Sequence, residues 1–396
     1  MVVYALNKMT AKNLRGMDRR RIALRGKGVK RLLREGKIGV YEATCLVLMA
    51  ITAKLFFASP RDLAEMVGPA MWLEQLVAVS TALVGFLFIF LLMKKFPGQD
   101  LVSVFETVFG KIAGSVISIV LAAAILFNSV MFTREFSEAV KVYIYPLTPP
   151  SMIIIFFLVP VLIMIYHGFE TLARTVSSFI WLYGISIISI FILAVPLYKY
   201  YNLFPLFDGG IEHLAIIGIR RSTAYGDILI LALFINSLQD IERFKKGGLA
   251  AVLFSGLLLI AGFLVLDLSF PNSVLEEQTI PVLALTRAIE FGTFFHRFES
   301  VYIFLWSISA ILAAGINLYV FTSIYCKVFR IKDQKPLVLP LGIIIFSIGL
   351  LLPSMTVIVD LLKLMWNYGS LIYFGIPILA LFVAVIRGKK GVKTSS

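Results

Sequence analysis

Residues Ala50-Ile-Thr-Ala-Lys-Leu-Phe-Phe-Ala-Ser-Pro60 interrupt an apolar run that begins near Ile38. Lys54 lies near the middle of what would otherwise be a membrane-spanning helix. A charge at that depth costs about 2.5 kcal/mol or more. Pro60 removes a backbone donor and clashes with the preceding turn. Because an interrupted backbone inside a membrane is tolerated only where protein or a cavity surrounds it, this stretch predicts a broken helix beside a cavity.

The composition identifies a membrane protein. The chain has 396 residues, of which 59% are hydrophobic, and it contains 33 Phe. That is too apolar for a soluble domain of this length and indicates an all-α, multi-pass membrane protein with membrane lipid as a partner. The net charge of +14 would favour nucleic acid in a soluble protein. Here the basic residues gather in the termini and short loops, so we expect no nucleic-acid partner.

Apolar runs divide the chain into a basic cytoplasmic tail (1–37), a transporter-like membrane domain (38–387) and a short cytoplasmic C-terminal tail (388–396). We expect ten spans, in the order Val40–Ala58, Met71–Met93, Ile112–Met131 with a continuation to Tyr143, Ser151–Tyr166, Thr175–Leu197, Ile219–Leu238, Gly248–Phe270, Val301–Tyr325, Leu337–Leu352 and Trp366–Ile386. A further short helix is expected to begin at Pro281, because proline is favoured in the first turn of a helix.

The distribution of basic residues predicts the orientation. An even number of spans places both termini on one side of the membrane. The N-terminal tail, Lys94, Arg243, Lys327 and Arg387 all lie on that side. The positive-inside rule therefore predicts that both termini are cytoplasmic.

A second interruption lies in the expected sixth span, at Ser222-Thr-Ala-Tyr-Gly-Asp-Ile-Leu229. Gly226 weakens the helix, and Asp227 adds a carboxylate to an apolar run. Breaks in the first and sixth of ten spans indicate a five-plus-five inverted repeat with a binding site between the breaks. The candidate ligand-binding residues are Thr52, Ala53, Lys54, Leu55, Phe127, Asn128, Ala224, Tyr225, Gly226 and Asp227.

The opposite charges of Lys54 and Asp227 allow three hypotheses. A zwitterionic amino acid can lie between them, with its carboxylate toward Lys54 and its amine toward Asp227. The two residues can instead pair with each other, as buried charges usually do. Lys54 can also act as a built-in cation in place of a coupling ion. Asn128 can contact a ligand or join helices by hydrogen bonding.

Other charged groups near the breaks support narrower expectations. Arg61 and Asp62 follow the first break and form either an outer gate or an interfacial salt bridge. Arg134, Glu135 and Glu138 are expected at the outer surface as local pairs one helical turn apart. Cys45 and Cys326 are expected to be free, buried thiols. No catalytic, cofactor-binding or metal-binding motif is evident, so we expect neither an enzyme nor a bound cofactor or metal.

Several segments resemble the spore germination permeases, the B subunits of nutrient germinant receptors in the amino acid–polyamine–organocation superfamily. They are Leu55-Phe-Phe-Ala-Ser-Pro-Arg61, Leu203-Phe-Pro-Leu-Phe207, Pro281-Val-Leu-Ala-Leu-Thr-Arg-Ala-Ile289 and Phe294-Phe-His-Arg-Phe-Glu-Ser-Val-Tyr-Ile-Phe-Leu-Trp306. The resemblance extends in length and span order from Gly36 to Arg387. Members of that family often have a glycine-rich first break, whereas this chain has Thr52-Ala53-Lys54.

The resemblance implies a LeuT-like bundle in the inner spore membrane. It also implies recognition of a small germinant, often an amino acid, and assembly with an A-type membrane subunit and a C-type lipoprotein. Signalling toward ion release and germination would follow. Two other functions fit the same residues: a proton-coupled secondary amino-acid transporter, and a membrane scaffold that binds no ligand because Lys54 and Asp227 pair.

Overall fold

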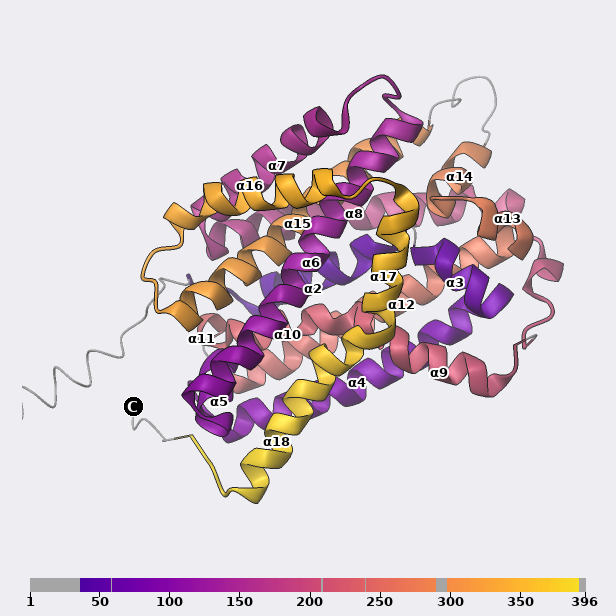
Figure 1. Ribbon diagram of the computed structural model, residues 1–396. Coiled ribbons are helices and arrows are strands. Elements are labelled where there is room, and N and C mark those ends of the chain that lie inside the picture. Colours follow the sequence, from indigo (N-terminus) through magenta and orange to yellow (C-terminus); the bar gives the residue numbers. More distant parts are fainter. Residues whose placement is uncertain (1–35, 58, 208, 239, 290–297, 392–396) are drawn as a thin grey trace, which may run out of the picture.

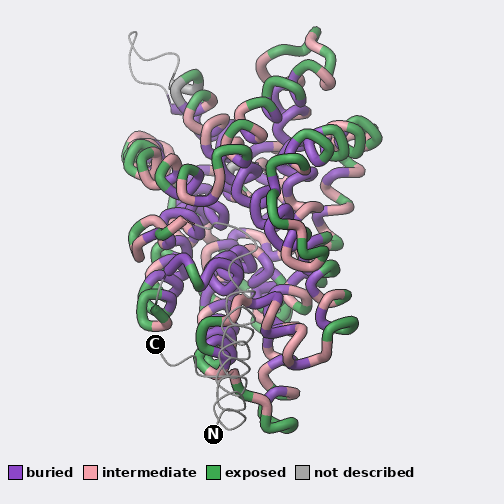
Figure 2. Tube along the Cα trace, turned by 90° about the vertical axis from the view of Figure 1, so that its left-hand side faces the viewer, coloured by how far each residue is buried: buried purple, intermediate pink, exposed green. Residues whose placement is uncertain are grey.

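The computed structural model describes residues 36–57, 59–207, 209–238, 240–289 and 298–391 and shows a bundle of long helices (Figure 1). The predicted N-terminal tail lies almost entirely outside the described residues, as does most of the C-terminal tail. The first four residues of the segment Phe294–Trp306 also lie outside them. Buried residues fill the middle of the bundle, and exposed residues cover its periphery (Figure 2).

The first predicted break is present. Helix α2 (Val40–Thr52) ends in a 3-10 turn, Ala53–Phe56, and α3 begins at Ser59 and ends at Val67. The Thr52 hydroxyl donates back to the Leu48 carbonyl at 2.7 Å, so it satisfies one acceptor in the last turn of α2. Pro60 lies in the first turn of α3, where its missing N–H leaves no hydrogen bond unmade.

The second break is also present, but its first half-helix is longer than predicted. Helix α9 (Ile211–Arg221) leads into a 3-10 segment, Ser222–Ile228, followed by α10 (Leu229–Leu233) and α11 (Ile235–Leu238). The predicted start at Ile219 was wrong because Glu212 and His213 make the first turns of α9 look like part of the preceding loop. Arg221, at the other end of α9, is buried against a carboxylate of α3.

The remaining helices largely follow the predicted order. They are α4 (Met71–Lys95), α5 (Leu101–Phe109), α6 (Lys111–Tyr143), α7 (Pro150–His167), α8 (Phe169–Leu193), α12 (Ile241–Ser269), α13 (Asn272–Glu277), α14 (Pro281–Ala288), α15 (Phe298–Phe329) and α16 (Lys335–Leu351). The continuation of the third span to Tyr143 is confirmed, as is the short helix that begins at Pro281. Helix α15 packs along α6, and α12 packs against both α2 and α4.

The last helix differs from its predicted bounds. It begins at Met355 instead of Trp366 and continues as α17 (Met355–Ser370), a π-helical turn (Leu371–Gly375) and α18 (Ile376–Ile386). The Ser354 side chain accepts a hydrogen bond from the Val357 N–H and so caps the start of α17. Lys363 falls in the part of α17 that the prediction left out. Its charge is compensated by acidic residues of α3, which the sequence does not reveal.

Within the described residues, seven helical segments are long and apolar enough to cross a membrane, and α16 is a shorter apolar helix. The chain is therefore an integral membrane protein, whereas the count of ten spans stays a prediction. The described chain ends lie at the same end of the bundle. The Ile38 N–H donates to Ser237 near the end of α11, and the Gly391 N–H donates to Lys95 at the end of α4.

Candidate functional site

The two broken helices meet at Lys54. Its ammonium donates to the Asp227 carboxylate at 2.6 Å and to the Ala224 carbonyl, in the unwound part of the sixth span, at 2.7 Å. The Lys54 side chain is 18% exposed and that of Asp227 is 4% exposed. The two charges therefore pair directly, as the second hypothesis predicts, and their 2.6 Å contact leaves no space for a ligand between the ammonium and the carboxylate.

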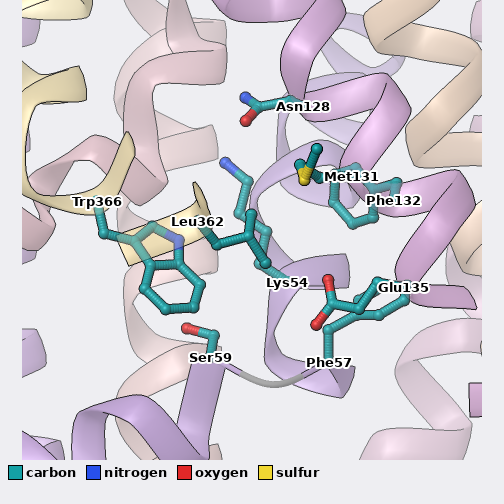
Figure 3. A pocket seen from close by; sticks show the side chains of 9 residues that line it. All are labelled: Lys54, Phe57, Ser59, Asn128, Met131, Phe132, Glu135, Leu362 and Trp366. Atoms are coloured by element: carbon teal, nitrogen blue, oxygen red, sulfur yellow. The ribbon is translucent and has the colours of Figure 1, made fainter. Parts of the chain in front are cut away.

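A cavity lies beside this pair (Figure 3). It encloses about 350 Å³ of empty space, a volume that includes the open solvent at its mouth. Its walls come from the first break, α6 and α17. The lining residues are Lys54, Phe57, Ser59, Asn128, Met131, Phe132, Glu135, Leu362 and Trp366. Of the predicted binding residues, Lys54 and Asn128 line this cavity.

Other predicted residues shape the first break. The Thr52 hydroxyl accepts a hydrogen bond from Tyr183 of α8 at 2.9 Å. Ala53 is fully buried in the hydrophobic core. Leu55 packs against Gly262 of α12, where a Cβ would lie 2.6 Å from a Leu55 methyl carbon. These residues hold the turn against neighbouring helices and thereby position Lys54.

The predicted residues of the sixth span also contact neighbouring helices and hold the second break in place. Tyr225 donates to the Gln75 side chain of α4 at 3.0 Å. Ala224 contributes its carbonyl to Lys54. The backbone of Gly226 packs against the ring of Tyr373. Phe127, on α6, is a half-buried residue packed against the core. The structure thus brings the predicted residues to one region but gives most of them supporting contacts.

Tyr373 was missed by the sequence analysis. It lies in the π-helical turn between α17 and α18, a local geometry that often marks functional sites. The Asn128 amide donates to its hydroxyl at 3.0 Å. Its ring covers Gly226 so closely that a Cβ there would lie 2.3 Å from a ring carbon. No local pattern in the sequence identifies Tyr373, because its neighbours form a plain apolar run.

Arg61 and Asp62, the residues of the predicted gate, have different surroundings. Arg61 pairs with Glu65 on the exposed side of α3. Asp62 is 1% exposed and pairs with Arg221 of α9 at 2.8 Å and with Lys363 of α17 at 3.3 Å. Three segments far apart in the sequence are therefore joined at Asp62.

This ion-pair network also touches the cavity. Arg221 donates to the Ser59 hydroxyl at 3.0 Å, and its guanidinium lies 4.3 Å from the centre of the Trp366 ring. Ser59 and Trp366 both line the cavity. The network therefore contacts two of the residues that line the cavity.

The expected position of Arg134 and Glu135 at the outer surface was wrong, because both are only 4% exposed. The local pair of Arg134 with Glu138 is confirmed. Arg134 also donates to the Leu352 carbonyl at 2.8 Å, just past the end of α16, where a cation is favourable. Glu135, the next residue on α6, lines the cavity instead.

Cys45 and Cys326 are free and buried, as predicted. In the part of the chain that the structure describes, no group of three or more His, Cys, Asp or Glu residues is placed to hold a metal ion.

Two interrupted helices that meet face to face beside a cavity define a membrane protein of the LeuT transporter fold, built from inverted repeats. A Na+-coupled sialic acid symporter in its substrate-bound outward-open state has a TM-score of 0.68 at 14% identity, covering 88% of this chain and 80% of its own. MhsT in complex with L-phenylalanine also has a TM-score of 0.68 at 14% identity, covering 90% and 91%. At such identities the likeness shows the fold alone.

The sequence comparisons establish the family. A profile described as spore germination protein matches residues 37–358, and the chain belongs to this family. Spore germination protein YndE of Bacillus subtilis (strain 168) is 25% identical over 365 residues, covering 90% of this chain and 98% of the relative. Spore germination protein A2 of the same strain is 20% identical over 322 residues, covering 79% and 86%. The resemblance found in the sequence segments is thereby confirmed.

Proposed function

We propose that this protein is the membrane subunit of a spore germinant receptor, and that it binds a small germinant, an amino acid, in the cavity beside Lys54. The observation that carries the proposal is the position of this cavity beside Lys54, the residue that links the first broken helix to the second. Ligand binding at such a junction can change how the half-helices pack. That change would then signal germination.

The chemistry of the cavity supports a small ligand with an apolar body. An ammonium has three donors, and two of those on Lys54 are used by Asp227 and Ala224. The third can reach a ligand carboxylate, and the Asn128 amide lies nearby. Phe57, Met131 and other apolar side chains would cover the ligand's body. Asp227 contributes by holding Lys54 in place.

The proposed setting is the inner spore membrane, with both termini in the cytoplasm and with A-type and C-type receptor subunits as partners. The family membership supports this setting. The expected tails at 1–37 and 388–396 would then face the cytoplasm, where anionic lipid attracts basic segments. We propose no enzymatic step and no cofactor.

Two alternatives have specific support. The fold shared with symporters favours a proton-coupled secondary amino-acid transporter as a second candidate. The direct contact between Lys54 and Asp227 favours a non-binding membrane scaffold as a third. In the scaffold, the ion pair would close the site permanently.

Thermal unfolding of the purified protein with each of the twenty amino acids tests the proposal. At 100 times its Kd, a ligand that binds only the folded state stabilises the protein by about 2.7 kcal/mol, which is measurable. We expect one or a few amino acids to raise the unfolding midpoint and none to accumulate inside vesicles that contain the protein alone. Uptake would favour the transporter, and a midpoint that no amino acid changes would favour the scaffold.

A further inference from the structure

The amide of Asn128 presents a hydrogen-bond acceptor to the cavity. This residue of α6 is half-buried and lines the cavity together with Lys54. Its amide nitrogen donates to the Tyr373 hydroxyl at 3.0 Å. Figure 3 shows its amide oxygen on the side that faces Lys54. Within the described residues no hydrogen bond reaches that oxygen, so a ligand can use it as an acceptor.

Tyr373 is placed to fix this orientation of the amide. Its ring is 2% exposed and packs closely on Gly226, so the hydroxyl has little freedom to move. A tyrosine hydroxyl can donate or accept a hydrogen bond. The Asp227 carboxylate acts electrostatically on this hydroxyl, and a negative charge attracts the hydroxyl hydrogen. The lone pairs of the oxygen are then left for the N–H groups of Asn128.

The same segment of the second break anchors both Lys54 and Tyr373. The Lys54 ammonium donates to the Ala224 carbonyl and to Asp227, and the Tyr373 ring packs on Gly226 between them. The third donor of Lys54 and the oxygen of Asn128 are therefore held at one end of the cavity. An α-amino acid has its ammonium and its carboxylate on the same carbon atom, so one head group can use this donor and this acceptor together.

We propose that the Asn128 oxygen accepts a hydrogen bond from the ligand's ammonium, and that Tyr373 is the positioning residue that keeps this oxygen toward the cavity. The inference rests on the proposed function and specifies its ligand class: α-amino acids in preference to acids without an amine. It assigns the ligand's amine to α6 instead of to Asp227, whose carboxylate contacts Lys54. The chemical basis is a charge-assisted hydrogen bond inside a largely apolar cavity.

The test uses two substitutions. Asn128→Leu removes the acceptor at similar side-chain volume, and Tyr373→Phe removes the hydroxyl but keeps the ring on Gly226. Tyr198→Phe is the matched control, because its hydroxyl donates to the Phe191 carbonyl at 2.6 Å and Tyr198 does not line the cavity.

The probes are each amino acid that stabilises the protein, its deaminated acid and its decarboxylated amine. For leucine these are L-leucine, 4-methylpentanoate and 3-methylbutan-1-amine. Unfolding midpoints over a range of ligand concentrations give the affinities, and the midpoint without ligand gives the stability of each variant.

We expect wild type to bind the amino acid about tenfold or more tightly than the deaminated acid. Asn128→Leu should bind the two about equally and should also weaken binding of the amine. Tyr373→Phe should lower the preference for the amino acid by about two- to tenfold, the effect of one neutral hydrogen bond. Neither substitution should change the affinity for the deaminated acid, and Tyr198→Phe should keep the wild-type preference.

Two results would overturn the inference while the proposed function stands. In the first, Asn128→Leu weakens the amino acid and the deaminated acid equally, which would make Asn128 a carboxylate contact or a structural residue. In the second, Tyr373→Phe lowers the midpoint without ligand but leaves the preference unchanged. The second result decides the matter if Asn128→Leu does not fold. If no amino acid stabilises wild type, both the proposed function and the inference fail.

Discussion

Replacing Lys54 by Met tests whether the pair with Asp227 holds the two broken helices together. The substitution removes the ammonium and keeps a side chain of similar length. It leaves the Asp227 carboxylate, only 4% exposed, without its 2.6 Å partner, and it removes the donor to the Ala224 carbonyl. Loss of one member of a buried pair is strongly destabilising, because the other charge stays buried.

The size of the effect follows from that burial. Breaking such a pair costs about 3–5 kcal/mol. With an unfolding entropy of about 2 cal/mol/K per residue, the value for globular chains, this corresponds to a midpoint about 4–6 °C lower for 396 residues. A double variant, Lys54→Met with Asp227→Leu, should recover most of the loss, because apolar groups of similar volume often replace a buried pair without cost.

The assay is thermal unfolding of purified protein in detergent, followed by tryptophan fluorescence. Arg174→Met is the control, because Arg174 pairs with Glu170 at the exposed surface of α8, where such pairs contribute little. The argument fails if Lys54→Met is as stable as wild type. It also fails if the double variant unfolds at the same temperature as the single variant.

Three further predictions concern the second break, the ion-pair network and the orientation. Gly226→Leu should abolish stabilisation by amino acids in thermal unfolding, because its Cβ would lie 2.3 Å from a ring of the π-helical turn; an unchanged ligand response would contradict this. Arg221→Met should lower the unfolding midpoint by several degrees, because it leaves the buried Asp62 carboxylate with only its longer contact to Lys363. Arg61→Met at the exposed surface should have little effect, and the reverse ranking would refute the network. A thiol at Tyr201 should react with an impermeant reagent from outside intact cells and one at Lys332 should not; the opposite labelling pattern would reverse the orientation.

The sequence alone identified the class of protein and both breaks. Lys54 and Asp227 were recognisable because a charge inside an apolar run is costly and needs a local reason. Pro60 and Gly226 marked the interruptions through backbone effects that do not depend on tertiary contacts. Because these signals depend only on neighbouring residues, the two breaks can be predicted without knowledge of the fold.

The start of a helix was harder to predict where charged residues interrupt it. Both α9 and α17 begin earlier than predicted. Glu212 and His213 near the start of α9, and Asp360 and Lys363 in α17, make these stretches look like loops in an apolar membrane protein. The charge of Lys363 is compensated by Asp62 of α3. A hydropathy pattern reflects how unfavourable each charge is in a membrane. It contains no information about an oppositely charged residue more than a hundred positions away.

The tertiary structure alone decided which residues face the cavity. Glu135, which was expected at the outer surface, lines the cavity because α6 continues to Tyr143 and presents the face that also carries Asn128. Tyr373 contacts the second break because it lies in a π-helical turn, which no sequence pattern predicted. The physical reason is that the propensity to form or break a helix depends on nearby residues, whereas the direction of a buried side chain depends on how distant helices pack.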